Sequence, residues 1–275
     1  YPGFIDHRAV AAEGIVELKA AYDEGLRTIV DVTTFDLGRD IGLLEEVSRG
    51  SGVHIIACTG NHLAVPRPFG DISPSVIAQL YVREIEEGIE GTGIKAGIIK
   101  VASDRGGITA PQEVVLRAAA RAHIHTGLPI STHTWSPDRV GEQQVKILEE
   151  EGVDLSRVYI GHSNDDTDMD YLLGLLNKGV WLGLDRYPGG RVPGTPNWEQ
   201  RTETAYALIQ AGFARTRSPS RARAKRPSLM IAFCRSEISE IRSWPLAGSN
   251  HTSLISNTLL SVIIMLTVRP NKHLL

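Results

Sequence analysis

Short runs of apolar and β-branched residues recur along the first 213 residues of the chain, with little polar alternation inside them. They occupy residues 27–34, 53–60, 96–103, 129–134, 158–164 and 180–186. Between these runs, apolar side chains return every three or four residues, as in Ile15, Leu18 and Tyr22, which is the period of a helix packed on one face. The pattern predicts strands alternating with helices, and therefore a parallel sheet covered by helices.

Glycines mark the ends of the predicted helices. Each helical stretch is followed, shortly before the next strand, by a glycine of the kind that stops helices; these are Gly25, Gly52, Gly93, Gly127, Gly152 and Gly179. Six such units, with no dinucleotide-binding glycine motif after the first strand, favour the α/β class and a (β/α)8 TIM-type barrel over a doubly wound sheet. The helix over residues 202–211 ends at Gly212, but the strand due next is missing. Residues 229–233 are a late substitute for it.

Charge and glycine content divide the chain near residue 214. The net charge is −3, yet residues 214–275 hold ten Lys and Arg against two acidic residues, and 26 of the 27 glycines precede them. We therefore expect one barrel domain over residues 1–213. Residues 214–275 are expected to form a divergent basic and apolar tail rather than a domain.

The tail suggests binding functions only weakly. The basic run over residues 215–226 could serve a nucleic-acid or partner-binding arm, but no aromatic interleaving or finger spacing accompanies it, so a solvated stretch is favoured over nucleic-acid binding. Residues 254–268 are apolar but short for a bilayer and contain Ser, Asn and Thr, which predicts a packed helix or strand and no membrane contact. A cytoplasmic location is expected, and a homo-oligomer is an open alternative.

Three predicted strand ends carry residues that can bind metals: Lys100, His133 and His162. The carboxyl ends of parallel barrel strands face one shared cavity. An ammonium in an apolar strand is costly, so burial should lower the pKa of Lys100, and its neutral amine could then take up carbon dioxide as an anionic carbamate. With two imidazoles this gives three ligands for zinc or another divalent metal. The competing interpretation is a hydrogen-bonded core histidine and a lysine that reaches solvent.

The other histidines are not predicted to share a metal. His123 and His125 have the spacing of a strand chelate, but they lie in a helical pattern, where side chains two apart point in nearly opposite directions. They are assigned to the outer helix layer. His62 has no predicted partner.

Several segments resemble the phosphotriesterase family of the amidohydrolase superfamily: RTIVDVTTFDLGRD (27–40), GIKAGIIKVASD (93–104), STHT (131–134), GVDLSRVYIGHSNDDTDMDYLLGLLNKG (152–179) and WLGLDRYPG (181–189). The resemblance runs from about Gly14 to Phe213 and is nearest to the lactonase-like members. It implies a (β/α)8 barrel with two metal ions, usually zinc, bridged by a carboxylated lysine and a hydroxide. That hydroxide attacks a phosphotriester or a lactone carbonyl.

Matched motifs assign roles to individual residues. The resemblance makes Lys100 the carboxylated lysine, His133 and His162 ligands of one metal, Asp165 a proton-relay residue and Arg186 a substrate-binding residue typical of lactonases. The family's His-x-His strand and its final Asp strand find no match, so the barrel is expected to lack its first and last strands or to have them replaced, and to hold at most one metal. The strands at 27–34 and 180–186 would then be unpaired edges.

The predicted function is a metal-dependent hydrolase of small lactones or organophosphate esters. Two alternatives stay open: a catalytically inactive, truncated barrel and a protein that binds partners through its basic tail.

Overall fold

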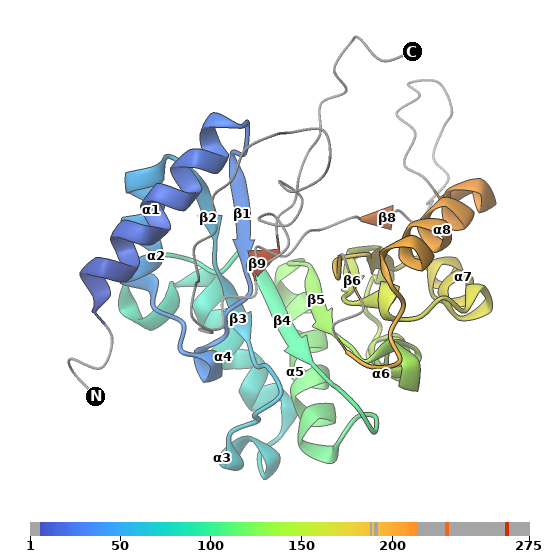
Figure 1. The fold of residues 1–275 in the computed structure, drawn as a ribbon. Helices are drawn as coiled ribbons and strands as arrows, with labels where there is room; N and C mark the ends of the chain where they lie inside the picture. Colours follow the sequence, from blue (N-terminus) through green and yellow to red (C-terminus); the bar gives the residue numbers. More distant parts are fainter. Residues whose placement is uncertain (1–5, 188, 190–191, 214–228, 231–261, 264–275) are drawn as a thin grey trace, which may run out of the picture.

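The computed structural model describes residues 6–187, 189, 192–213, 229–230 and 262–263. Each of the six predicted runs contains at least one strand. In chain order the strands are β1 (Thr28–Asp31), β2 (His54–Ile56), β3 (Cys58–Gly60), β4 (Ile98–Ala102), β5 (Ile130–His133), β6 (Val158–Ile160), β7 (Trp181–Gly183), β8 (Leu229–Met230) and β9 (Val262–Ile263). Figure 1 shows them at the centre of the molecule with the helices around them.

One predicted run belongs to two sheets. Residues 53–60 are divided at Ala57, so that β2 pairs with β1 while β3 pairs with β4. The first sheet has the order β2-β1-β9 and the second the order β3-β4-β5-β6-β7-β8. Every pairing is parallel except that of β9 with β1. This sequential parallel order is consistent with a TIM-type barrel, although the described strands do not form a closed one.

The strands at 27–34 and 180–186 were expected to be unpaired edges, and this prediction is wrong, because both have backbone partners. β7 pairs with β8, with Leu182 opposite Leu229, and β1 pairs with β9, with Val30 opposite Ile263. Late segments therefore supply short partners to both strands, and residues 229–230 take the place that the late substitute was predicted to fill. The basic run 215–226, and residues 254–268 apart from β9, lie outside the described residues.

The helices follow the predicted periodicity, and several of them begin with a side-chain cap. They are α1 (His7–Asp23), α2 (Ile41–Ser51), α3 (Arg67–Gly70), α4 (Pro74–Glu86), α5 (Ala110–Thr126), α6 (Val140–Glu150), α7 (Met169–Lys178) and α8 (Trp198–Leu208). Capping boxes start α5 and α8, at Thr109 with Gln112 and at Asn197 with Gln200. All six predicted stop glycines have positive φ, and Gly52, Gly127 and Gly179 are the C-cap residues of α2, α5 and α7. The prediction is wrong for Gly93, because α4 already ends at Glu86.

None of the helices in the described part of the chain is long and apolar enough to cross a bilayer.

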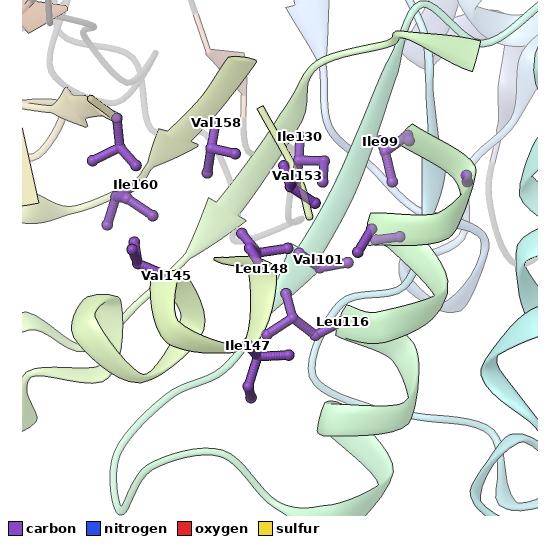
Figure 2. Packing of buried hydrophobic residues seen from close by; sticks show 14 of the residues in the cluster. Ile99, Val101, Leu116, Ile130, Val145, Ile147, Leu148, Val153, Val158 and Ile160 are labelled. Atoms are coloured by element: carbon purple, nitrogen blue, oxygen red, sulfur yellow. The ribbon is translucent and has the colours of Figure 1, made fainter. Parts of the chain in front are cut away.

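The two faces of the central strands have different environments. On β4, Ile99 and Val101 belong to the main hydrophobic cluster, which includes Leu116 of α5 and Leu148 of α6. Figure 2 shows these side chains meeting between the strands and the two helices. Ile98 belongs to a separate cluster with Val30, Val32 and Cys58. Because side chains alternate along a strand, Lys100 lies on the same inner face as Ile98.

A close approach between β3 and β4 depends on Gly60. Its φ is +109°, and a Cβ added there would lie 2.0 Å from the backbone oxygen of Lys100. We expect Gly60→Ala to lower the free energy of unfolding by about 1–3 kcal/mol, because the variant must strain or displace this backbone. Gly174→Ala in α7 is the matched control: nothing lies within 4 Å of its Cβ position, and alanine favours a helix. Urea unfolding of both variants measures the difference. Equal stabilities would contradict the close packing at Gly60.

Candidate active site

The predicted site residues lie at the carboxyl ends of neighbouring strands. Lys100 pairs in register with Ser131 on β5, and Ala102 pairs with His133. Since Lys100 and Ala102 are two residues apart, Lys100 and His133 share the inner face. His162 follows β6 after Gly161, and its φ of 60° turns the chain sharply at the strand end. The parallel topology thus brings these groups to one edge of the sheet.

Lys100 is buried, as predicted, with 4% of its surface exposed. Burial lowers the pKa of its amine to about 8, and the nearby Arg186 charge acts in the same direction, while Asp185 and Cys58 oppose it. The shift follows from the cost of holding an ammonium away from water. A substantial fraction of the amine is therefore uncharged at mildly alkaline pH, which is the form that reacts with carbon dioxide.

His133 and His162 face each other directly. Nε2 of His162 lies 2.9 Å from Nδ1 of His133, and the ring centres are 4.6 Å apart. Burial, helped by the charges of His162 and Lys100, lowers the pKa of His133 to about 3 against the opposing effect of Asp104. His133 is therefore neutral at physiological pH, which is the state in which imidazole binds metals.

A carboxylate lies on the outer side of each of these rings. Asp185 accepts hydrogen bonds from the backbone N–H of His162 at 3.0 Å and from its Nδ1 at 2.9 Å, while Tyr159 donates to the other oxygen at 2.9 Å. Burial would raise the pKa of Asp185, but the charge and hydrogen bond of His162 outweigh it, and the net shift is downward. Asp104 Oδ2 lies 3.6 Å from Nε2 of His133, an electrostatic contact longer than a hydrogen bond.

The geometry of His133 and His162 shows whether these two residues can bind one metal ion. One of the two facing nitrogens donates to the other across 2.9 Å, and the tautomer decides which one carries the proton. A cation between the rings would replace that proton, and nitrogens on one tetrahedral zinc lie about 3.3 Å apart, so a small opening suffices. The pair therefore fits two metal ligands. As the side chains stand, however, no three His, Cys, Asp or Glu residues in the described part of the chain form a cation site. A third ligand requires Lys100 or a movement of another group.

Asp165 and Arg186 are brought together, with a third residue that the sequence did not reveal. Arg186 Nη1 donates to Asp165 Oδ2 at 2.6 Å, and Arg201 Nη2 donates to Oδ1 at 2.9 Å. Arg201 comes from α8 and is 1% exposed, whereas the Arg186 side chain is 31% exposed. Both carboxylate oxygens are thus paired, and a proton relay through Asp165 requires one contact to open.

His62 also lies beside the site, although no partner was predicted for it. Its ring packs edge-on against His133, with the centres 5.2 Å apart. The available signal was its position just after a predicted strand, as for His133 and His162. His123 and His125 are helical and separate, as predicted: Nδ1 of His123 lies 2.6 Å from the carbonyl oxygen of Leu128, and His125 lies 3.2 Å from Glu86.

The fold and site together define an α/β protein whose buried lysine and paired imidazoles meet at the carboxyl ends of parallel strands. The chain belongs to the phosphotriesterase family, which it matches over residues 5–217.

Three curated relatives illustrate this membership. The chain is 42% identical to an aryldialkylphosphatase of Saccharolobus solfataricus, over 72% of this chain and 63% of the relative. It is 46% identical to a phosphotriesterase homology protein of Mycobacterium tuberculosis, over 62% of this chain and 54% of the relative. It is 32% identical to an N-acetyltaurine hydrolase of Dictyostelium discoideum, over 72% of this chain and 56% of the relative. The chain thus spans little more than half to just under two thirds of these proteins.

Proposed function

We propose that this chain is a metal-dependent hydrolase of lactones or phosphotriesters, built on a (β/α)8-type barrel. The observation that carries the proposal is the pair of facing nitrogens on His133 and His162, each ring backed by a carboxylate, beside the buried amine of Lys100. Family membership, and relatives named as hydrolases, support the same reaction class.

Zinc or another divalent metal, when bound, would activate water and polarise the substrate oxygen. His133 and His162 would hold one such ion. Lys100 would join them after its neutral amine attacks carbon dioxide, forming an N–C bond and releasing a proton to solvent. Asp185 and Tyr159 keep His162 in the required orientation.

Arg186 and Asp165 are proposed to serve the substrate. Arg186 is the more exposed of the two guanidiniums on Asp165, so its other N–H groups can face negative charge developing on a lactone or phosphotriester oxygen. Asp165 holds that arginine and would carry a proton away once its short contact to Arg186 opens.

Metal-dependent hydrolysis tests the proposal. The chelator-stripped protein should hydrolyse a lactone or an aryl dialkyl phosphate only after zinc, manganese or cobalt is added with bicarbonate. Lys100→Ala and His162→Asn should lose at least about a hundredfold in kcat/KM, because several kcal/mol of charge stabilisation disappear. His125→Asn, on the outer face of α5, is the matched histidine control and should keep wild-type activity. A folded wild type that is inactive with every metal would identify a catalytically inactive barrel instead.

A further inference from the structure

The turns that follow β4 and β5 continue the inner face of the sheet beyond the candidate site. Asp104 comes after β4, and its Oδ2 lies 3.6 Å from Nε2 of His133. Trp135 follows His133 by two residues, and its backbone is extended, with φ −107° and ψ 96°. Because side chains alternate along an extended chain, Trp135 lies on the same side as His133, one step closer to the loops. An indole therefore comes next after the imidazole of His133 on this face.

Arg105 rests on that indole. Its guanidinium carbon, Cζ, lies 4.2 Å from the centre of the Trp135 ring, which is the distance of a cation–π contact. Arg105 directly follows Asp104, so the same two turns supply both the contact of Asp104 with His133 and the contact of Arg105 with Trp135. The guanidinium is thereby held at an exposed position beside the candidate site.

The turn that carries Arg105 is fixed by its own hydrogen bonds. The backbone N–H of Arg105 donates to Asp104 Oδ1 at 2.9 Å, and that of Gly106 donates to Asp138 Oδ2 at 2.8 Å. Asp104 and Gly107 also form a backbone bridge across the turn. A fixed turn and a stacked side chain reduce the conformational entropy that Arg105 would lose on binding a ligand.

The charge of Arg105 is not neutralised within the described part of the chain. No carboxylate of a described residue forms an ion pair with it, whereas Arg186 and Arg201 are both paired with Asp165. The acidic residues of the same turns have other contacts: Asp104 with His133, and Asp138 with the backbone of Gly106. A guanidinium that stacks on a ring through its face keeps its N–H edge for a planar anion.

We propose that Arg105, held by Trp135, is a specificity-determining residue that binds an anionic group of the substrate, such as a carboxylate or a sulfonate. The anionic group is remote from the ester bond that is broken, and it accepts hydrogen bonds from Arg105 without reacting. This inference rests on the proposed hydrolase function. It adds that the preferred substrates carry a negative charge on the part that faces the turns after β4 and β5.

Paired lactones, assayed with zinc and bicarbonate, test the assignment. Each pair consists of two γ-lactones whose alkyl side chains end in a carboxylate or in the corresponding primary amide, and the pairs differ in chain length. We expect wild type to have a higher kcat/KM for the carboxylate at one chain length or more. Arg105→Met should lower the carboxylate-to-amide ratio at least about tenfold, because charge-assisted hydrogen bonds are lost. Arg105→Lys should give an intermediate ratio.

The matched control is Arg49→Met on α2, which removes an exposed positive charge away from the site and should keep the wild-type ratio. A wild type without preference for the carboxylate at any chain length would overturn the proposal. So would a ratio in Arg105→Met equal to that of wild type.

Binding of lactams separates this proposal from the proposed function. In the lactam analogues an N–H replaces the ring oxygen, so calorimetry on the zinc-loaded protein measures affinity without hydrolysis. Tighter binding of the carboxylate lactam, lost in Arg105→Met, supports the role of Arg105 even if no lactone is hydrolysed, and that result would refute the proposed function alone. Lactone hydrolysis with equal affinity for the carboxylate and amide lactams would refute the role of Arg105 alone.

Discussion

Replacing Arg201 by methionine is expected to lower the free energy of unfolding by about 3–5 kcal/mol, because it leaves a buried carboxylate without one of its partners. Arg201 and Asp165 are each about 1% exposed in their side chains, and Arg201 also donates to the carbonyl oxygens of Asn164 and Pro196. Methionine fills a similar volume but supplies none of these donors. Urea unfolding followed by circular dichroism measures the loss.

Two further variants show whether the loss comes from burial. Lys178→Met breaks a surface ion pair in which the Lys178 and Glu149 side chains are 53% and 38% exposed. It should lower the free energy of unfolding by less than about 1 kcal/mol. Arg201→Lys keeps the charge but not the planar fork and should fall between the two. If Arg201→Met were as stable as Lys178→Met, the buried contacts of Arg201 would not be holding Asp165.

The stability contributed by Lys100 is expected to depend on pH. The lysine titrates near 10.5 in the unfolded chain and at about 8 when folded. Between these values the unfolded state binds more protons, so raising the pH favours the folded state. The free energy of unfolding of wild type minus that of Lys100→Met should rise by about 3 kcal/mol from pH 8 to pH 10.5. Below pH 8 the difference should level off.

The measurement is made without metal or carbon dioxide, so that the amine stays unmodified. Taking a difference between two proteins removes the effect of the buried Tyr81 and Tyr159, whose raised pKa values lower stability at high pH. Lys95→Met, at an exposed position before β4, is the matched control. Its free energy of unfolding should change with pH in the same way as that of wild type. A constant difference between Lys100→Met and wild type would show that Lys100 is not buried as an amine.

The spacing of apolar residues predicted the parallel α/β order, because apolar positions mark the side chains of strands and helices that are buried in the core. Lys100, His133 and His162 were predicted to lie together because each is at a strand end, and the carboxyl ends of parallel strands meet at one edge of the sheet. The ends of the sheets were less predictable. β8 lies in the apolar run 229–233 that was predicted as a late substitute strand, but the pairing of β9 with β1 over two residues was not predicted.

The supporting groups of the site were also missed, for identifiable reasons. Asp185 follows β7 as His162 follows β6, so its position held a signal that a search for metal ligands passed over. Asp104 lies in the turn after β4, and tertiary contacts decide which residues are its neighbours. Arg201 occurs in an ordinary helical pattern, and nothing in its spacing indicates that a guanidinium is buried there.

The division of the predicted strand 53–60 at Ala57 separates the sheet of β1 and β2 from the sheet of β3 to β8. Helix α1 packs on β1 through a small cluster of Leu26, Ile29 and Val53. Helix α2 instead contributes Ile41 to the main cluster, and Val30 of β1 packs with Cys58 and Ile98 across the division. Arg39 connects the two parts, because it donates hydrogen bonds to the carbonyl oxygen of Cys58 on β3 and to Glu84 of α4. Because α1 rests mainly on this small cluster, its amide protons are expected to exchange with solvent before those of β4 to β6.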